Sequence, residues 1–511
     1  MNALELTIKQ LIDSQVKTSK DLSAIKKIIA KKYKISCPTN VNLLRAYHGM
    51  VKNKRLKESK GLEVLLKTRP IRSLSGIVNV SVLTKDWPCP GKCLYCPKQK
   101  GVPKSYLSNE PAVMRAILNK YDPFRQVKMR LEALRENGHP TDKIELRIIG
   151  GTWSFYTKKY QKWFVKKCFT ACNERDSKSL KRSQEINEKA RQRIIGLSIE
   201  TRPDFINQNE IKWLRELGVT MVELGIQSIY DDVLKLNRRG HNIDSTINAT
   251  KLLKDAGFKI CYQMMLNLPG STVKRDEEMF KQLFSNDRFK PDYLKIYPCA
   301  LLKQAPLYKW WLAKKYKPYT FNQLINLIKV IEKEIPYYVR VQRIARDIPS
   351  QSIVVGPAKI SNLRQMIDKE CKCIRCREVK GNYDAKEKLY LFRQNYNASN
   401  GNEIFLSFEN KNRKKLYSLL RLRITSSKKA FIRDLHTYGQ MLSINNLVFN
   451  SKETPQHKGL GKKLIQEAEK ITKEEFGINK IAVISGIGVR GYYRKLGYKL
   501  KTTYMAKSLD R

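Results

Sequence analysis

Three closely spaced cysteines precede a long stretch of sequence in which strand-like and helix-like segments alternate. Cys89, Cys93 and Cys96 form a C-x3-C-x2-C cluster. The apolar, strand-like runs that follow lie at 144–149, 194–199, 220–225, 259–266 and 293–297, and the segments with helical periodicity include 160–172, 209–217, 245–256 and 275–284. This alternation predicts an α/β fold built on a parallel sheet, open or barrel-like, with right-handed crossovers.

Polar or glycine residues follow the predicted strands, where parallel sheets bind ligands. Gly150 and Gly151 follow the first strand, Glu200 follows the second and Gln227 the third. Chemistry in such sheets takes place at the carboxyl ends of the strands. The pattern fits a ligand-lined barrel mouth, and it also fits ordinary strand-to-helix loops.

The three cysteines indicate an iron–sulfur site. Three thiolates can bind three irons of a 4Fe–4S cluster and leave the fourth iron open to an external ligand. Structural zinc is the alternative, but it needs four ligands and no fourth is evident nearby. The spacing, with Tyr95 before the last cysteine, resembles the signature of the radical S-adenosylmethionine (radical SAM) enzymes. The resemblance implies S-adenosylmethionine on the open iron, Gly150 and Gly151 against its methionine part, and Glu200 and Gln227 as further polar contacts.

The charge of the chain points to a polyanionic partner. Its 511 residues include 100 Lys plus Arg and 47 Asp plus Glu, a net charge of +53. Nucleic acid is the default partner for such an excess, and lysines that merely fill the surface are the alternative. Near the N-terminus, apolar residues at helical spacing predict one apolar helix face, with many lysines on the opposite side. Those lysines contact phosphates or are simply solvated. That face comprises Leu22, Ile25, Ile28, Ile29 and Tyr33.

Composition also favours a reducing, cytoplasmic protein without a membrane partner. No stretch approaches about 18 apolar residues, and the first residues lack the apolar centre of a secretory signal. The 11 cysteines are therefore expected to be metal ligands or core thiols. Five of them stand among apolar residues and are expected to be core thiols or incidental: Cys37, Cys168, Cys172, Cys261 and Cys299.

The C-terminal part changes to antiparallel signals. Strand-like segments are expected at 388–396, 403–409, 417–424, 431–438 and 480–484, with a helix at 462–474. The string Q-H-K-G-L-G, from Gln456 to Gly461, resembles the pyrophosphate loop of GNAT acetyltransferases. Glycines there let backbone N–H groups approach the coenzyme A diphosphate at a helix start, where the dipole favours anions.

A radical SAM cluster followed by a GNAT domain is similar to one family, the catalytic subunit of Elongator and its stand-alone prokaryotic relatives. The likeness runs from about residue 65 to the end, with strings such as I-E-T-R-P-D from 199, R-R-G-H from 238 and Y-Y-R-K-L-G-Y from 492. It implies a tRNA carboxymethyluridine synthase. In that reaction an adenosyl radical takes hydrogen from the methyl group of acetyl-CoA, the carbon radical adds to C5 of the wobble uridine, and thioester hydrolysis leaves 5-carboxymethyluridine. The implied partners are tRNA, acetyl-CoA, S-adenosylmethionine and an electron donor.

The resemblance also implies coenzyme contacts, residue by residue. Lys143 looks like a lysine that contacts acetyl-CoA from the radical domain, although its position alone indicates a surface lysine before a strand. The matching GNAT positions are Asp434, Leu435, His436 and Thr437 on a strand, Gln456, Gly459, Leu460, Gly461 and Lys462 in the loop, and Tyr493. Tyr493 suits a phenol near the thioester sulfur, so Tyr493 and Lys143 are the catalytic candidates. Asp434 stands where the family has glutamate, and because main-chain contacts dominate there, little change is expected.

A second cysteine group resembles a zinc-bearing linker between the two catalytic domains. It consists of Cys371, Cys373 and Cys376. Three cysteines leave tetrahedral zinc one ligand short, and His436 is a candidate for the fourth. Thiols that contact RNA are the alternative.

These observations predict four regions. They are a basic helical tRNA-binding region over 1–68, a partial (β/α) radical SAM barrel over 69–355, a cysteine-rich zinc linker over 356–385 and a mixed α+β GNAT domain over 386–511. The compact first cysteine cluster resembles the prokaryotic members, which implies a stand-alone enzyme that can form a homodimer, without obligate Elongator subunits. Two rival functions stay open: a protein lysine acetyltransferase, which charge repulsion from a Lys-rich substrate disfavours, and a tRNA-binding scaffold.

Overall fold

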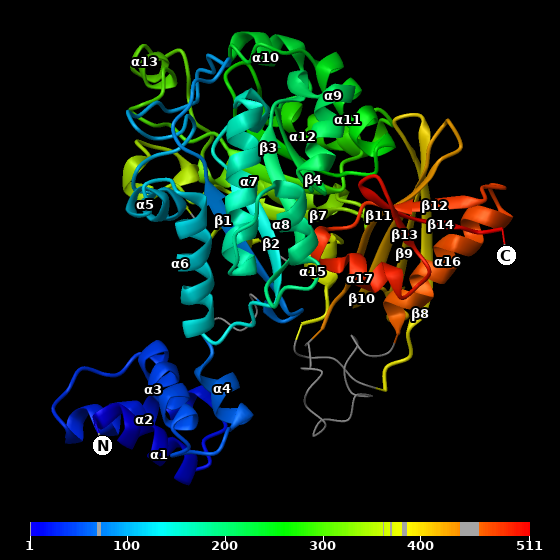
Figure 1. Ribbon diagram of the computed structural model, residues 1–511. Helices are drawn as coiled ribbons and strands as arrows, with labels where there is room; N and C mark the ends of the chain where they lie inside the picture. The colour runs from blue at the N-terminus through cyan, green and yellow to red at the C-terminus, as the bar shows by residue number, and fades with distance from the viewer. Residues whose placement is uncertain are drawn as a thin grey trace.

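Two seven-stranded sheets organise the chain in the computed structural model, which describes residues 2–68, 73–360, 362–367, 370–380, 386–439 and 459–510. The N-terminal helices form a separate group below the first sheet in Figure 1. None of the described helices is long and apolar enough to cross a membrane.

The first sheet is parallel throughout and runs in sequence order from β1 to β7, so that β1 and β7 are its two edges. Its strands are β1 (Ile77–Leu83), β2 (Lys143–Ile149), β3 (Arg193–Thr201), β4 (Met221–Gln227), β5 (Lys259–Leu266), β6 (Tyr293–Pro298) and β7 (Arg340–Ile344). The predicted parallel, barrel-like α/β sheet is confirmed. The five strands expected from the sequence are β2 to β6, and the structure adds both edges.

Helices cover the outer face of this sheet. They are α6 (Pro123–Glu136), α7 (Lys158–Asn173), α8 (Leu180–Asn187), α9 (Gln208–Glu216), α11 (Ile243–Asp255), α12 (Val273–Ser285) and α14 (Phe321–Glu334). The shorter helices of this part of the chain are α5 (Pro111–Leu118), α10 (Asp231–Leu236), α13 (Leu307–Leu312) and α15 (Ile374–Arg377). In β2 the residues Ile144, Leu146 and Ile148 are buried in the main core, whereas Glu145 and Arg147 point to the other face. Since strand side chains alternate, one face packs under helices and the other is polar.

The second sheet is mixed and has the order β13-β14-β12-β11-β10-β9-β8. Its strands are β8 (Tyr390–Ala398), β9 (Gly401–Glu409), β10 (Leu416–Ile424), β11 (Ala430–Thr437), β12 (Lys480–Val483), β13 (Lys499–Lys501) and β14 (Tyr504–Ser508); its helices are α16 (Leu460–Glu474) and α17 (Arg490–Arg494). The pair β11–β12 is parallel and the other pairs are antiparallel. Leu464, Ile465 and Ala468 of α16 share a core with this sheet, as the predicted mixed α+β domain requires.

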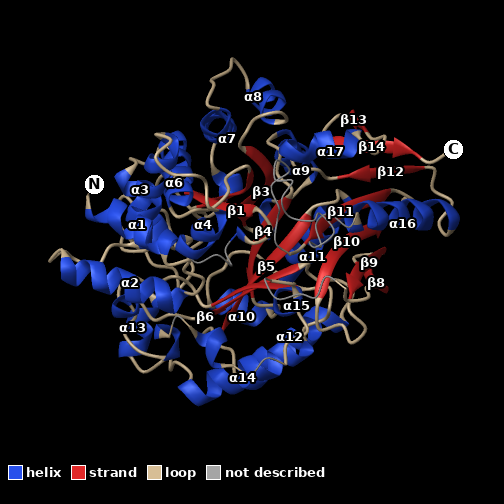
Figure 2. Cartoon of the chain, turned by 90° about the horizontal axis from the view of Figure 1, so that it is seen from below, coloured by secondary structure: helices blue, strands red, loops and turns tan. Residues whose placement is uncertain are grey.

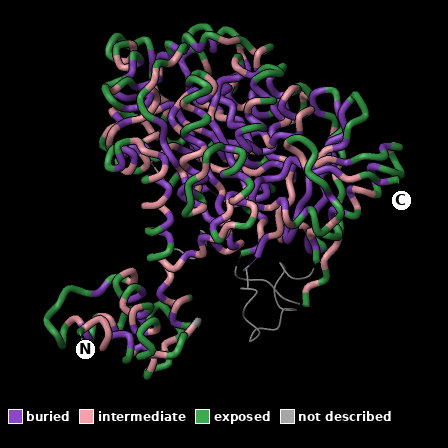
Figure 3. Tube along the Cα trace, viewed as in Figure 1, coloured by how far each residue is buried: buried purple, intermediate pink, exposed green. Residues whose placement is uncertain are grey.

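The four N-terminal helices have a core of their own. They are α1 (Ala3–Asp13), α2 (Ser19–Lys32), α3 (Asn40–Lys52) and α4 (Lys60–Leu66), and Leu22, Ile25 and Ile29 of α2 are buried among them. Ile28 is 55% exposed and Tyr33 39% exposed, so the expected apolar face was too wide by these two residues. Figure 3 shows this region set apart from the buried interior of the two sheets.

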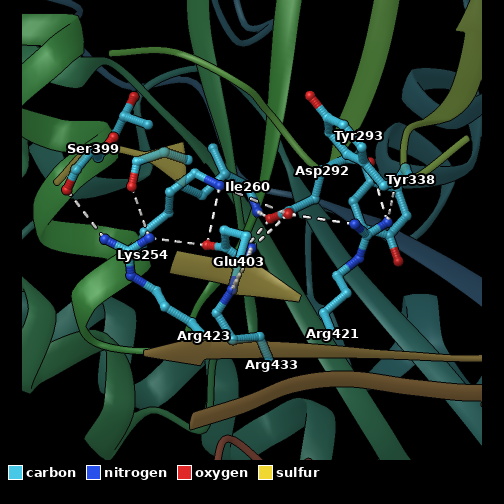
Figure 4. A network of polar contacts seen from close by, with 12 residues as sticks. Lys254, Ile260, Asp292, Tyr293, Tyr338, Ser399, Glu403, Arg421, Arg423 and Arg433 are labelled. Carbon is cyan, nitrogen blue, oxygen red and sulfur yellow. Dashed lines mark hydrogen bonds and ion pairs between the residues drawn. The ribbon is translucent and has the colours of Figure 1, made fainter. Parts of the chain in front are cut away.

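The second sheet docks against the amino ends of strands β5 and β6, and the two sheets lie next to each other in Figure 2. Asp434 of β11 accepts a hydrogen bond from Tyr293 at 2.7 Å and pairs with Lys259 at 3.6 Å; Tyr293 and Lys259 are the first residues of β6 and β5. Beside them lies a fully buried ion network, in which Arg433 bridges Asp292 and Glu403 (Figure 4). The docking therefore places the coenzyme strand, the part of β11 from Asp434 to Thr437 that is predicted to contact coenzyme A, against the amino ends of the parallel strands.

Candidate functional site

The three cysteines of the first cluster lie in the loop that follows β1, at the carboxyl edge of the sheet. Cys93 and Cys96 are buried and Cys89 is half-buried. Gly91 lies between them, and a Cβ there would stand 2.7 Å from the Arg202 guanidinium, 3.4 Å from the Cys93 sulfur and 3.8 Å from the Cys89 sulfur. A side chain at this position would therefore intrude on the thiols.

Two buried arginines surround these thiols. Arg239 donates a hydrogen bond to Cys93 Sγ at 3.5 Å, and Arg202 donates to the carbonyl of Arg239 at 2.7 Å. Burial opposes ionisation of Cys93, but the charge and hydrogen bond of Arg239, together with Tyr95 and the Arg202 charge, outweigh it, and the pKa of the thiol is lowered. Burial raises the pKa of Cys96 to about 12. A bound metal replaces such a thiol proton, so this donor set fits a 4Fe–4S cluster.

The glycines expected beside the cluster lie next to it. Gly150 has φ +132°, and a Cβ there would lie 2.0 Å from Thr84 Oγ1, so only glycine fits. Thr152 Oγ1, just after Gly151, lies 3.8 Å from Cys89 Sγ. The glycine turn thus touches the first cysteine.

The two polar candidates also face this region. Glu200 accepts hydrogen bonds from Tyr106 at 2.9 Å and from Gln263 at 3.1 Å. Gln227 has φ +76°, and its buried Oε1 has no partner among the described residues. Strained backbone with an unused acceptor is typical of a ligand site.

The coenzyme candidates lie at the other end of the sheet. Gly459 is the N-cap of α16, and a Cβ on Gly461 would stand 3.4 Å from the Tyr492 hydroxyl. Tyr493 is buried, and burial raises its pKa above the usual range. Burial lowers the pKa of His436 to about 4, and its Nε2 has no partner in the described part of the chain. The predicted contact Gln456 lies outside the described residues.

One cavity of about 1460 Å³ reaches both groups. Its walls include the three cysteines of the first cluster and also Gly151, Glu200, Gln227, Asp434, Leu435, His436, Thr437, Gly459, Gly461, Lys462 and Tyr493. Lys143, Gly150 and Leu460 are not in its walls, although Ile77, the strand neighbour of Lys143, is. The polar face of the parallel sheet therefore lines a passage from the cysteines to the coenzyme strand.

Buried ion pairs lie along the wall of this passage. Lys295 pairs with Glu223 and, at 3.5 Å, with Glu200, while Arg147 lies 3.9 Å from Glu223. Burial opposes ionisation of Glu223, but Lys295 and Arg147 outweigh it, so its pKa is lowered. Glu200 was predicted from the sequence, whereas Lys295, Glu223, Arg147 and the two arginines beside the thiols were not. The available signal was charge at alternate positions of apolar strands, as in β2 and β6.

The second cysteine group is gathered in space. The sulfurs of Cys371, Cys373 and Cys376 lie within 4.8 Å of one another, and His436 does not belong to this group. Arg364 donates to Cys373 and Cys376, at 3.3 Å each. The closeness suits a single metal ion, and the candidate fourth ligand His436 lies outside the group. Among the five cysteines predicted to be core or incidental, Cys37 is exposed and the other four are buried: Cys168, Cys172, Cys261 and Cys299.

Comparison with known proteins identifies relatives along nearly the whole chain. Residues 89–283 match the radical SAM superfamily and residues 291–372 match its C-terminal domain. The chain is 42% identical to a tRNA uridine(34) acetyltransferase of Methanocaldococcus infernus, covering 99% of this chain and 98% of that one. It is 35% identical to Elongator complex protein 3 of Homo sapiens, over 98% and 96% of the two chains. A solved structure of M. infernus Elp3 lacking residues 1–46 matches with a TM-score of 0.74 and 42% identity, over 85% of this chain and all of that one.

Proposed function

The chain belongs to the family of tRNA uridine(34) acetyltransferases and Elongator complex protein 3, and we propose that it is a tRNA carboxymethyluridine synthase acting on the wobble uridine. The substrates are acetyl-CoA, S-adenosylmethionine and tRNA. The product is 5-carboxymethyluridine, with coenzyme A released on hydrolysis of the thioester.

One observation carries this proposal: the cavity that joins the cysteine loop to the coenzyme strand. A protein acetyltransferase needs only the end of the cavity at the coenzyme strand, and a simple S-adenosylmethionine enzyme needs only the end at the cysteine loop. A reaction that activates the methyl group of acetyl-CoA needs both reactants in one enclosure.

Named residues of this chain support each part of the proposal. Cys89, Cys93 and Cys96 would hold the 4Fe–4S cluster, which with S-adenosylmethionine supplies a 5′-deoxyadenosyl radical when both are bound. Backbone amides at the start of α16 would bind the coenzyme diphosphate, as helix N-termini do. Tyr493 would place its hydroxyl near the thioester, protonated because burial raises its pKa.

The charge of the chain supports tRNA as the acceptor. A net charge of +53 suits the phosphates of an anticodon arm. A uridine whose C5 is modified must leave the base stack to enter an enclosed site.

The test is a reaction with labelled coenzyme. Anaerobically reconstituted protein is incubated with dithionite, S-adenosylmethionine, methyl-deuterated acetyl-CoA and tRNA, and nucleosides are analysed by mass spectrometry. We expect deuterium in 5′-deoxyadenosine and in 5-carboxymethyluridine. Tyr493→Phe, which keeps the cluster, and Cys93→Ser, which loses it, separate the two ends of the cavity. An intact cluster without either labelled product would reject the synthase, and acetylated lysine instead would support the protein acetyltransferase.

A further inference from the structure

Helix α5 presents an apolar surface to solvent. Met114 is 57% exposed, Ile117 44% and Leu118 70%, and their spacing puts them on one side of the helix. We call these three residues the α5 patch. Several large aliphatic side chains gathered on one exposed face often mark an interaction site.

The opposite side of α5 packs on the loop that follows the last cluster cysteine. Val113 and Ala116 are fully buried against Val102, six positions after Cys96. Tyr121, just beyond the helix, donates a hydrogen bond to the carbonyl of Gly101 at 2.8 Å. The α5 patch is thus separated from the cysteine loop by one layer of packed residues.

The sequence around the α5 patch is basic. Residues 92 to 121 include six lysines and arginines and one acidic residue, Glu110. Glu110 is buried and faces Arg346 at 3.5 Å, so its charge is not offered to solvent. Lys98, Lys100 and Lys120 are exposed.

We propose that the α5 patch is the docking site of a small acidic electron-transfer protein that reduces the cluster. An apolar centre with a charged rim is the usual composition of a transient interface, and an acidic partner complements the basic rim. The donor loses one electron, the cluster held by the cysteines gains one, and no atom is transferred. The inference rests on the part of the proposed function that places a 4Fe–4S cluster on Cys89, Cys93 and Cys96.

Two other occupants fit the patch less well. RNA is held by aromatic or arginine planes on which bases stack, whereas Met114, Ile117 and Leu118 are aliphatic. A second copy of this chain would bring two basic rims together, which repel.

The test compares a protein donor with a small one. Reconstituted protein is mixed in a stopped-flow instrument with a reduced, acidic 4Fe–4S ferredoxin or with dithionite, and the loss of cluster absorbance is followed without tRNA or acetyl-CoA. In the triple variant Met114→Gln, Ile117→Gln and Leu118→Gln we expect at least a tenfold lower rate constant with ferredoxin and an unchanged one with dithionite. Leu312→Gln on α13, 59% exposed, is the matched control.

A binding measurement gives a second readout. The Kd for a redox-inert, gallium-substituted ferredoxin should rise by a similar factor in the triple variant and stay unchanged in the control. An equal ferredoxin rate and Kd in wild type and triple variant would overturn the proposal. So would a variant that instead loses affinity for an anticodon stem-loop or changes oligomeric state. Because no step needs tRNA or acetyl-CoA, failure here is distinct from failure of the synthase.

Discussion

Replacing Asp292 with asparagine should loosen the joint between the two sheets. The Asp292 carboxylate accepts hydrogen bonds from Arg433 at 2.5 and 3.0 Å and from the amide of Ile260 at 2.9 Å. Arg421 and Lys254 lie 3.6 and 3.9 Å away, and all four charged side chains are at most 1% exposed (Figure 4). Asn keeps the shape and removes the charge.

The expected loss follows from the charge balance. Burial opposes ionisation of Asp292, but Arg433 and its basic neighbours outweigh it and hold its pKa well below the usual range, so it is ionised at pH 7. Without it, among the described residues, Arg433 keeps only Glu403 as a charged partner, and Arg421 keeps only Asp434. Removing one partner of a buried ion pair costs about 3–5 kcal/mol. Because Asp292 precedes β6 and Arg433 lies on β11, the loss should fall on the docking of the second sheet.

Urea unfolding combined with hydrogen exchange measures this effect. In Asp292→Asn, the amides of β11 should exchange at a lower urea concentration than in wild type. Their opening free energy should be smaller by about 3–5 kcal/mol. Glu475→Gln is the control, since it removes the exposed Arg393–Glu475 pair, worth about 0–1 kcal/mol. If Asp292→Asn and Glu475→Gln lower the opening free energy equally, the network does not hold the sheets together.

The remaining predictions concern other parts of the chain. Tyr493→Phe should slow acetyl-CoA consumption by about 10²-fold or more, measured as released thiol. His436 has a pKa of about 4 in the folded protein and about 6.5 when unfolded, so on acidification the unfolded chain binds the proton first. The free energy of unfolding should therefore fall between pH 6.5 and pH 4. His436→Gln should remove up to about 3 kcal/mol of that fall, measured from urea unfolding midpoints. Lys27→Ala with Lys31→Ala should reduce the salt dependence of tRNA binding, by about 0.9 in the log–log slope per lost phosphate contact, measured by anisotropy. The wild-type protein should carry one zinc ion and Cys373→Ser none, measured by metal analysis.

Each of these has an outcome that contradicts it. Normal thiol release in Tyr493→Phe would exclude the phenol from the reaction. An unchanged acid profile in His436→Gln would mean that the folded protein binds this proton as easily as the unfolded one. Lys235→Ala on α10 is the control for the lysines, and an equal salt slope in both variants would leave the α2 lysines as solvated charge. Full zinc in Cys373→Ser would exclude that thiol as a ligand.

The sequence predicted the central strands well because they are apolar on at least one face and well separated. The edges β1 and β7 were missed for different reasons. Strand β1 alternates valine with Asn79 and Ser81, so its strand pattern is present in the sequence and was overlooked. Strand β7 has only Val341 and Ile344 buried, so it carries too few apolar residues to stand out.

The joint between the sheets could not be predicted locally. Arg421, Arg423 and Arg433 alternate with apolar residues, a pattern that indicates a solvent-facing side of a strand, yet all three are at most 1% exposed. Their partners Asp292 and Asp255 are more than a hundred residues away in the sequence. The cavity depends on the same docking, so its continuity could not be read from either domain alone.

That continuity makes the two proposed cofactor sites neighbours for a ligand designed to span them. A compound that joined an adenosyl-sulfonium head to a pantetheine tail would occupy both ends of the passage. It would lose translational entropy once on binding, whereas two separate ligands lose it twice. Its tail would meet the coenzyme strand at a high effective concentration once its head was bound, and the gain would depend on linker length. Measured against linker length, the affinity of such a series would serve as a molecular ruler for the passage in solution.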